Sequence, residues 1–574
     1  MKIIGISSHR SGVHDNSAVL IEDGKVIFAE AEERLSRVKH DGSFPYLTIN
    51  EALKVSHNKI KNIDYFYSAN PEESIFLMFL TSLRLLPVVG FRTYIQSIIN
   101  RFRFKTQKVS SGKSPKYYVD AGYPLEKLVR VSHYLAHAAA AAYTSPYDNS
   151  MVIAMDGFGP GENGEPLSGQ IYKFYDNKLE TIDKVPVWGS LGLYYGAVTK
   201  ALGFKLNDGE GKTMGLAAYG NSKVCYRQLK AFFPEFKNGK WKAKPSIMDI
   251  LNIQREEVFI KSKTLELLHR YIDKYGRENV SSACQLVFEE EIIKYVKYLV
   301  KRYKIKNLVL VGGIFLNVKA NMRIFYEISK NIFIYPNPAD GGTAMGAAIL
   351  GSLEKDKKYK RKEIIHSAYG RIYTDFEILK ELKKTKDITY KKINIGFTKA
   401  VAQMLVQGKV VGWFEGKGEW GPRALGQRSV IADPRNIKTK NRINDILKGR
   451  EWFMPFAPSM LKESADKYLK TVRKGPFMIL ADDIIKNNKK DIVAAIHVDD
   501  TARPQIVTPE ANKLYHEVIF QFKKKTGVGV ILNTSFNKHG LPIVYSPRDA
   551  IDHLLWKTID SLAIGNYIVN RKDK

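Results

Sequence analysis

The sequence predicts an α/β protein of two domains, the second of mixed α+β type. Its 574 residues are too many for a single hydrophobic core, so two large domains are expected. Apolar, strand-like runs end repeatedly in glycine loops, at 156–157, 311–313 and 340–342, and helical runs such as 281–302 lie between them. A polar stretch at 354–363 follows these units, and we place the boundary between the domains there.

The first element is an apolar strand at 2–6, and Asp23-Gly24 between two further apolar runs predicts a β-hairpin. Repeated β units that each close on a glycine loop are typical of the two-lobed, actin-like and sugar-kinase (ASKHA) type of ATPase, as an analogy of fold alone. We therefore predict a first domain of this type at residues 1–355 and a second domain at 364–574.

The composition is that of an ordinary globular protein, with 44% hydrophobic and 26% charged residues. Two cysteines, Cys225 and Cys284, argue against a disulfide framework and a cysteine-built zinc site. The first residues begin like a core strand without the layout of a signal peptide, so we expect a cytoplasmic protein.

The net charge of +31 comes from 90 basic and 59 acidic residues. Such an excess is compatible with nucleic acid, an anionic membrane or anionic ligands as partners. Because the lysines are widely dispersed, we favour a solvated basic surface and expect no nucleic-acid partner.

Residues 74–91 are apolar enough to be compared with a membrane span. Arg84 and Pro87 interrupt them, whereas a span needs about 20 apolar residues with few charges. We predict that residues 70–118 form a helical insertion packed on the first domain, without stable membrane insertion. Contact with a membrane interface is the alternative.

Two histidines four residues apart, His133 and His137, lie in an alanine-rich run that predicts a helix. At this spacing both imidazoles share one helix face and can bind one metal ion, although a structural histidine pair is as common. Two carboxylates at the ends of strand-like runs, Asp156 and Asp340, are where open α/β sheets place metal and phosphate chemistry. No glutamate lies between the histidines, so we expect a metal that positions substrate rather than one that generates hydroxide for hydrolysis.

Four segments of the second domain gather cations and small polar groups. A single arginine of this kind most often forms a surface ion pair, but the four segments together predict a pocket for a small, highly charged phosphate ester. The segments are 413–429 with Lys417, Arg423 and Arg428; 448–458 with Arg450; 500–505 with Arg503; and 530–537 with Ser535 and Asn537.

Several motifs carry a resemblance to a known family. They are Gly-Pro-Arg-Ala-Leu-Gly-Gln-Arg-Ser at 421–429, Asn-Thr-Ser-Phe-Asn at 533–537, His-Asp-Asn-Ser-Ala at 14–18 and Glu-Glu-Arg-Leu-Ser-Arg-Val-Lys-His-Asp-Gly at 32–42. In these motifs, and over essentially its full length, the chain resembles the NodU/CmcH-type O-carbamoyltransferases, which decorate nodulation factors and antibiotics.

The resemblance implies an actin-like N-terminal domain, similar to the tRNA threonylcarbamoyl-transfer proteins, and a YrdC-like C-terminal domain. It implies that carbamoyl phosphate and ATP form a carbamoyl-adenylate, from which a hydroxyl of a small-molecule or sugar acceptor takes the carbamoyl group. The implied metal is iron (Fe²⁺), with Mg²⁺ accompanying ATP. The implied metal ligands are His133, His137, Asp156 and Asp340, and the implied carbamoyl phosphate site is Lys417, Arg450, Arg503, Ser535 and Asn537, supported by Arg423 and Arg428.

The remaining candidates lie in the first domain. His14 is a candidate general base, with a structural histidine as the alternative, and Lys39 is a candidate near the transfer centre. Glycine loops let backbone amides approach a nucleotide, and a helix that begins near Thr343 offers its positive end. The predicted nucleotide-binding residues are Gly312, Gly313, Asn317, Gly341, Gly342 and Thr343.

Two other functions compete with this prediction. One is a tRNA threonylcarbamoyl-type transferase, and the other is a non-catalytic basic protein that binds RNA or a membrane. The sequence does not identify the acceptor. We expect a homodimer.

Overall fold

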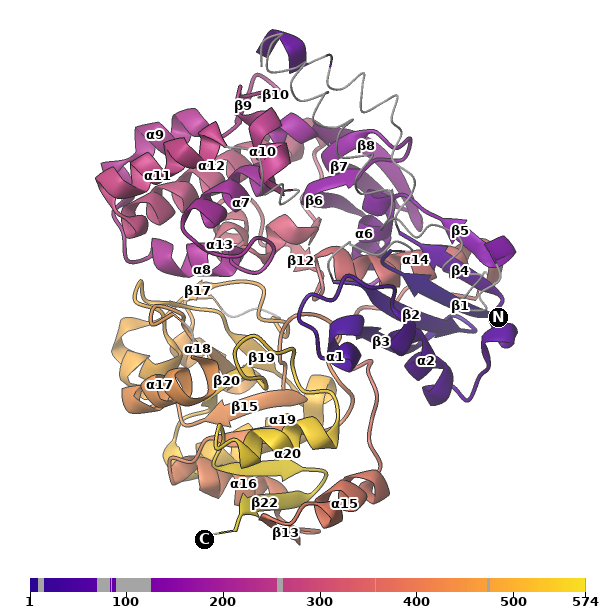
Figure 1. The fold of residues 1–574 in the computed structure, drawn as a ribbon, viewed down its shortest axis with the longest axis vertical. Coiled ribbons are helices and arrows are strands. Elements are labelled where there is room, and N and C mark those ends of the chain that lie inside the picture. Colours follow the sequence, from indigo (N-terminus) through magenta and orange to yellow (C-terminus); the bar gives the residue numbers. More distant parts are fainter. Residues whose placement is uncertain are drawn as a thin grey trace. The chain divides into compact units, whose positions relative to one another are not determined.

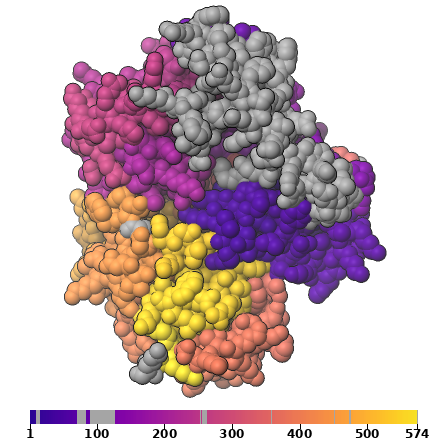
Figure 2. Space-filling view, in the orientation of Figure 1, coloured from indigo at the N-terminus to yellow at the C-terminus, as the bar shows by residue number. Residues whose placement is uncertain are grey.

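The computed structural model describes residues 1–8, 15–69, 83, 85–88, 125–254, 262–356, 358–449, 451–471 and 475–572, and the others are grey in Figures 1 and 2. The chain forms two compact units. Unit 1 is Met1–Ile27 with Gly42–Glu363, and unit 2 is Phe28–Asp41 with Ile364–Lys574. The sequence analysis places residues 28–41 in the first domain, whereas the structure groups them with unit 2.

The first sheet has five strands in the order β3-β2-β1-β4-β5, of which β3 extends from unit 1 into the residues grouped with unit 2. β1 runs antiparallel to β2 and parallel to β4, which runs parallel to β5. The predicted hairpin joins β2 to β3 through Asp23 and Gly24, which both have positive φ, as a type I′ turn requires. The strands are β1 (Lys2–Ile6), β2 (Ser17–Glu22), β3 (Lys25–Ala31), β4 (Tyr65–Ser68) and β5 (Leu128–Arg130).

The second sheet of unit 1 repeats this topology. Its order is β8-β7-β6-β11-β12, in which β6 runs antiparallel to β7 and parallel to β11, and β11 runs parallel to β12. The strands are β6 (Ser150–Pro160), β7 (Pro166–Tyr175), β8 (Lys178–Pro186), β11 (Leu308–Val311) and β12 (Ile332–Ile334). The repeat confirms the predicted α/β class with two lobes.

Two alanine-rich helices lie between these sheets (Figure 1). α6 (His133–Ala142) follows β5 and packs on β6, whereas α14 (Thr343–Gly351) follows β12 and packs on β1 and β4. The helices contact each other so closely that a Cβ at Gly346 would lie 1.7 Å from the carbonyl oxygen of Ala136. Small side chains therefore set the distance between the two lobes.

A group of helices completes unit 1. α12 contacts α7, α8, α9, α11 and α13, and it contains the predicted helical run at 281–302. Among the described residues, no helix combines the length and the apolarity needed to cross a bilayer. Most of the predicted insertion at 70–118 lies outside the described residues. The other elements are α2 (Tyr46–Val55), α7 (Leu191–Ala201), α8 (Glu210–Ala217), α9 (Tyr226–Phe232), β9 (Glu235–Lys237), β10 (Lys240–Lys242), α10 (Ile247–Gln254), α11 (Lys263–Tyr275), α12 (Arg277–Tyr303) and α13 (Val318–Glu327).

Unit 2 is built on a mixed eight-stranded sheet in the order β13-β22-β21-β14-β15-β20-β16-β19. One hydrophobic cluster contains residues of α16 and α19, and a second contains residues of α15 and α20. Trp413 and its neighbour Phe414 on β14 belong to different clusters, so helices cover both faces of the sheet. The strands are β13 (Ile388–Lys392), β14 (Val411–Phe414), β15 (Arg428–Ala432), β16 (Ala457–Leu461), β19 (Gln505–Val507), β20 (Val530–Ser535), β21 (Ser561–Ile564) and β22 (Tyr567–Arg571), and the helices are α1 (Glu32–Ser36), α15 (Asp375–Lys384), α16 (Phe397–Val406), α17 (Ile437–Ile443), α19 (Pro509–Thr526) and α20 (Pro547–Leu555).

Candidate metal centre and donor site

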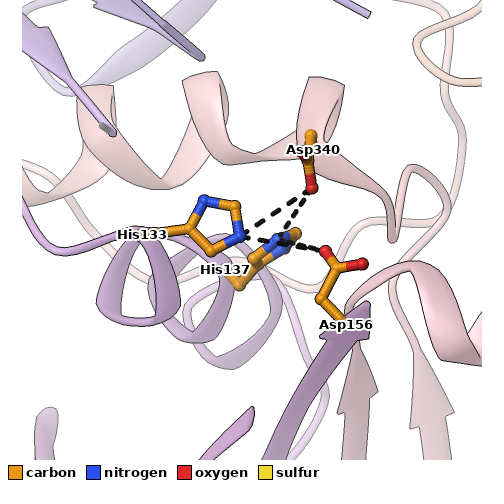
Figure 3. A group of neighbouring side chains, drawn as sticks. All are labelled: His133, His137, Asp156 and Asp340. Atoms are coloured by element: carbon orange, nitrogen blue, oxygen red, sulfur yellow. Dashed lines mark ion pairs between the residues drawn. The ribbon is translucent and has the colours of Figure 1, made fainter. Parts of the chain in front are cut away.

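His133 and His137 lie one turn apart at the start of α6, and both are buried. The helix begins where Ser132 accepts a hydrogen bond from the backbone N–H of Leu135, so the cap fixes the first turn that carries His133. Figure 3 shows both imidazoles directed toward the same point.

Asp156 and Asp340 approach this point from the second lobe. The sequence predicts that the strand ends at Met155, but β6 continues to Pro160 with a register shift between Met155 and Gly159. This irregularity lets the Asp156 carboxylate leave the regular ladder. Asp340 opens the turn before α14, and the hydroxyl of Thr343 donates to its carbonyl oxygen at 2.6 Å.

Neighbouring glycines make room for these side chains. A Cβ at Gly159 would lie 2.5 Å from Cδ2 of His133, and a Cβ at Gly313 would lie 2.9 Å from Oδ1 of Asp156. Any larger residue at either position would displace the ring or the carboxylate.

The four side chains have the geometry of a metal site. Nε2 of His133 lies 3.8 Å from Oδ2 of Asp156 and 3.8 Å from Oδ1 of Asp340, and Nε2 of His137 lies 3.4 and 3.6 Å from the same atoms. Ligands about 2.1 Å from one tetrahedral ion are about 3.4 Å apart. Nε2 of both histidines and Oδ2 of Asp156 are buried without hydrogen-bond partners among the described residues, as atoms reserved for a ligand would be. Two imidazoles and two carboxylates suit several divalent first-row metals.

Electrostatics favour a charged cluster. Burial lowers the pKa of His137, but the facing carboxylates of Asp156 and Asp340 outweigh this effect and raise the pKa to about 9. Burial likewise raises the pKa of Asp156, but the facing imidazoles of His133 and His137 bring that pKa well below its usual value. The carboxylate of Asp156 is therefore ionised, and a metal that binds His137 must displace the proton from its ring.

The predicted nucleotide-binding loops lie beside the four metal candidates. Two of their glycines and Asn317 also make contacts that the fold itself requires. A Cβ at Gly312 would lie 1.9 Å from the carbonyl oxygen of Met155, and one at Gly342 would lie 1.8 Å from that of Asn337. Asn317 caps α13 and exchanges two hydrogen bonds of 3.0 Å with Gln285. The structure thus places Gly313, Gly341 and Thr343 next to the metal candidates, whereas it ties the Asn317 side chain to a helix.

In unit 2, side chains hold the loop at 421–426 in place through hydrogen bonds to its backbone carbonyl groups. The side chains of Asn533, Gln505 and Trp413 donate to the carbonyl oxygens of three consecutive residues, at 3.1, 2.8 and 2.8 Å. The three carbonyls are those of Ala424, Leu425 and Gly426. Glu419 accepts from the amides of Leu425, Gln427 and Arg428 at 2.9, 2.8 and 3.0 Å. Hydrogen bonds to its carbonyl groups and from its amide groups therefore hold the loop in one conformation.

The two arginines of this loop differ in their contacts. Arg428 is buried over the ring of Phe414, and its guanidinium donates to backbone carbonyls that include those of Glu415 and Gly416. It thus holds the turn that presents the exposed Lys417. Nε of Arg423 is buried without a hydrogen-bond partner among the described residues, and burial lowers its pKa to about 10. Arg423 is therefore better placed than Arg428 to bind an anion.

Ser535 and Asn537, at the end of β20, share a partner that the sequence analysis did not select. The ammonium of Lys448 lies 3.0 Å from Oγ of Ser535 and 2.8 Å from Oδ1 of Asn537. Lys448 lies in a segment that the sequence singles out for its cations, but Arg450 was the expected ligand there. Only the structure shows that Lys448 is buried, and no pattern in the sequence indicates this burial.

The remaining candidates are distributed as follows. Arg503 lies half-buried between Thr501–Ala502 and β19, and Lys39 lies in the part of unit 2 formed by residues 28–41. His14 and Arg450 lie outside the described residues, so their predicted roles stay predictions.

Comparison with known families decides the assignment. A family described as "Carbamoyltransferase N-terminus" matches residues 2–349, and one described as "Carbamoyltransferase C-terminus" matches residues 402–571. The chain belongs to the carbamoyltransferase family. It is therefore an enzyme of the transferase class, as the resemblance predicts.

Relatives of this carbamoyltransferase align along most of their lengths. A protein of Methanocaldococcus jannaschii is 31% identical over 100% of both chains, and the nodulation protein NolNO of Sinorhizobium fredii is 30% identical over 98% of this chain and 79% of its own. The 3'-hydroxymethylcephem-O-carbamoyltransferase of Streptomyces clavuligerus is 25% identical over 78% of this chain and 84% of its own. Among solved structures, HypF of T. kodakarensis aligns with a TM-score of 0.32 at 14% identity over 62% of this chain and 48% of its own, an overlap too low to add to the assignment.

Proposed function

We propose that this carbamoyltransferase is an ATP-dependent O-carbamoyltransferase. It forms a carbamoyl-adenylate from carbamoyl phosphate and ATP and transfers the carbamoyl group to a hydroxyl of a small-molecule or sugar acceptor. The observation that carries the proposal is the convergence of two histidines and two aspartates, in which Nε2 of both histidines and Oδ2 of Asp156 are buried without a hydrogen-bond partner among the described residues. The family supplies the identity of the transferred group, and the O-carbamoyltransferase among the relatives supports a hydroxyl as acceptor.

The proposed reaction has three steps. Water cleaves the P–O bond of carbamoyl phosphate, which leaves inorganic phosphate and carbamate. A carbamate oxygen then bonds to the α-phosphorus of ATP as the bond to pyrophosphate breaks. In the last step the acceptor oxygen bonds to the carbamoyl carbon, the bond between that carbon and the AMP oxygen breaks, and the hydroxyl proton passes to a base, for which His14 is the candidate.

Unit 2 supplies the donor site in this proposal. Arg423 and Lys417 bind the phosphate, while Arg428 and Glu419 keep the loop that carries them in one conformation. Ser535 and Asn537 hold the carbamoyl group through neutral hydrogen bonds. A site that is fixed before the ligand arrives loses less conformational entropy on binding.

Unit 1 supplies the transfer site. His133, His137, Asp156 and Asp340 hold a divalent metal, for which the resemblance implies iron. When bound, that metal supplies a Lewis acid that offsets negative charge on phosphate and carbonyl oxygens. Gly313, Gly341 and the start of α14 at Thr343 leave the backbone open to the nucleotide beside it.

Trapping the intermediate tests the proposal without an acceptor. Purified enzyme with carbamoyl phosphate, ATP and hydroxylamine should form hydroxyurea, AMP, phosphate and pyrophosphate, all measurable by mass spectrometry and phosphate assays. Reactions without ATP or without enzyme control for direct attack on carbamoyl phosphate. Absence of ATP-dependent hydroxyurea from the metal-loaded enzyme would contradict the proposal, and product formation only from threonine and bicarbonate would favour the tRNA threonylcarbamoyl-type alternative.

A separate experiment tests whether donor binding belongs to unit 2 and carbamoyl transfer to unit 1. His133→Ala should retain binding of carbamoyl phosphate in calorimetry but lose carbamoyl transfer to any acceptor, because the variant leaves the donor site of unit 2 intact. Loss of donor binding by a folded His133→Ala protein would show that the donor site depends on the histidines.

A further inference from the structure

A buried lysine ties together the two small polar residues at the end of β20. Lys448 closes the helical turn Asn444–Lys448 after α17, and the residue is only 4% exposed. Its ammonium lies 2.7 Å from the carbonyl oxygen and 3.0 Å from Oγ of Ser535. It also lies 3.0 Å from the carbonyl oxygen and 2.8 Å from Oδ1 of Asn537.

These contacts fix the orientation of both side chains. An ammonium can only donate hydrogen bonds, so Asn537 must direct its amide oxygen toward Lys448 and its amide nitrogen away from it. That nitrogen donates to the carbonyl oxygens of Leu541 at 2.6 Å and Lys538 at 3.3 Å. The hydroxyl of Ser535 donates to Oδ1 of Asn537 at 2.6 Å, so one lone pair of that hydroxyl faces the lysine while its proton faces the amide.

The surroundings hold this cluster rigidly from both sides. Phe536, between the two polar residues, is fully buried in a core cluster of unit 2. Nε2 of His553 accepts from the amide of Lys538 at 3.0 Å, one residue beyond Asn537. Burial lowers the pKa of His553 to about 4, and Lys448 and Arg37 contribute in the same direction, so the neutral ring serves as an acceptor.

We propose that Lys448 is a positioning residue of the donor site, which locks Ser535 and Asn537 into one preformed binding unit for the carbamoyl group of carbamoyl phosphate. The inference rests on the proposed function. Lys448 acts through these two residues: without its ammonium, only the hydrogen bond between Ser535 and Asn537 and the bonds from the Asn537 nitrogen would orient the two side chains, and binding would have to order them further. A positioning role predicts a specific loss of affinity for carbamoyl phosphate, whereas a purely structural tie predicts a loss of stability alone.

The test is the full chain with Lys448→Met, which keeps the length of the side chain and removes its donors. The Michaelis constant for carbamoyl phosphate should rise by about 10- to 100-fold, as expected for the loss of hydrogen bonds to a charged group. The value of kcat and the Michaelis constant for ATP should change less than about threefold. Lys467→Met is the matched control, because this exposed lysine pairs with Asp491 in the same unit.

Chemical rescue separates the charge from the fold. Alkylation of Lys448→Cys with bromoethylamine restores an ammonium at nearly the original reach, and it should bring the Michaelis constant back toward that of the wild type. Cys225 and Cys284 are buried and need to be shown unmodified by mass spectrometry. If Lys448→Met does not fold, Lys448→Arg replaces it, since a planar fork cannot serve all four oxygens and should still raise the Michaelis constant at constant kcat.

Two outcomes overturn the inference, and a third overturns its premise. The first is an unchanged Michaelis constant for carbamoyl phosphate in folded Lys448→Met, and the second is an equal rise of the Michaelis constants for carbamoyl phosphate and ATP. Either result would mean that Lys448 only stabilises the fold. A wild-type enzyme that neither binds carbamoyl phosphate in calorimetry nor turns it over would instead refute the proposed function.

Discussion

Gly159 shows how a residue without a side chain can decide the chemistry of the metal site. A Cβ at this position would lie 2.5 Å from Cδ2 and 3.0 Å from Nε2 of His133, so alanine would displace a predicted ligand without removing it. The neighbouring Gly157 has room, because its Cβ would meet only Leu193 at 3.8 Å.

Gly159→Ala should therefore weaken metal binding by about 10-fold or more, comparable with the loss of a residue that orients a ligand. Titration with divalent metal followed by calorimetry measures the affinity, and metal analysis gives the stoichiometry. Gly157→Ala is the control and should bind as the wild type does. Equal affinities for the two variants would mean that His133 is not a ligand.

Glu30 is a buried carboxyl in unit 2 whose pKa is raised above the usual value of a glutamate. Its side chain lies between Gly370 and Gly418, where added Cβ atoms would lie 2.6 and 2.9 Å from its Oε2. Burial raises its pKa from 4.5 to about 7, although the cation of Arg34 acts in the opposite direction. The folded protein therefore binds this proton more tightly than the unfolded chain does.

The free energy of unfolding should fall as the pH rises from about 5 to 8, because the native state retains a proton that the unfolded state has lost. One proton contributes at most about 1.4 kcal/mol per pH unit, so Glu30 accounts for up to about 3 kcal/mol over its window. Glu30→Gln should flatten this dependence in urea unfolding at pH 5 and 8, and the exposed Glu180→Gln should not. An unchanged slope in Glu30→Gln would show that Glu30 is ionised in the folded state throughout.

At the scale of elements, the crossing of α6 and α14 joins the two lobes of unit 1. Both helices are alanine-rich, and each packs on the sheet of the other lobe. The crossing also sets the metal site, because His133 and His137 lie at the start of α6 and Asp340 lies just before α14.

Gly346→Val should destabilise unit 1 by at least about 1–3 kcal/mol, since even its Cβ would lie 1.7 Å from the carbonyl oxygen of Ala136 and the helices would have to separate. Thermal unfolding measures the loss, and metal affinity should fall with it. Gly211→Ala in α8 is the matched control, because an added Cβ would meet no described atom within 4 Å beyond its chain neighbours and its own helix backbone, and it should be neutral or slightly stabilising. Equal stability of the two variants would contradict the close crossing.

The sequence predicts these elements well where the signal is local. The spacing of His133 and His137, and the carboxylates after apolar runs, follow from helix and strand periods alone, and the structure brings all four residues together. The role of Lys448 is not local, since its partner Ser535 lies 87 residues away in sequence. The continuation of β6 beyond Met155 escapes prediction because a register shift leaves no mark in the pattern of apolar residues.

At the scale of the whole molecule, the two units are interleaved along the chain. The chain leaves unit 1 after Ile27, contributes residues 28–41 to unit 2 and returns to unit 1 at Gly42. No sequence pattern marks this excursion, because the contacts that define it are with residues far along the chain. Arg37, for example, donates at 2.6 Å to the carbonyl oxygen of Ile543, 506 residues away.

Residues 28–41 are bound to the same loops that carry the predicted donor site. Arg34 donates to the carbonyl oxygen of Gly421, at the start of the loop at 421–426, at 2.9 Å. Arg37 donates to Pro542 as well as Ile543 and lies 3.6 Å from the carboxylate of Asp549. Hydrogen bonds from charged groups contribute about 1.5–3 kcal/mol each, a large share of the stability of a domain of this size.

A fragment of residues 364–574 should consequently be unstable, although it contains the whole eight-stranded sheet. Joining residues 28–41 to its N-terminus through a flexible glycine–serine linker should raise its thermal midpoint and its solubility, because the linker restores the bonds of Arg34 and Arg37. The same fusion with both arginines replaced by alanine controls for the added length and should behave like the fragment without the segment. If the fragment 364–574 alone unfolds at the same temperature as the fusion, residues 28–41 merely rest on unit 2; if the fusion is more stable and also binds carbamoyl phosphate, the donor site is completed by a segment from the opposite end of the chain.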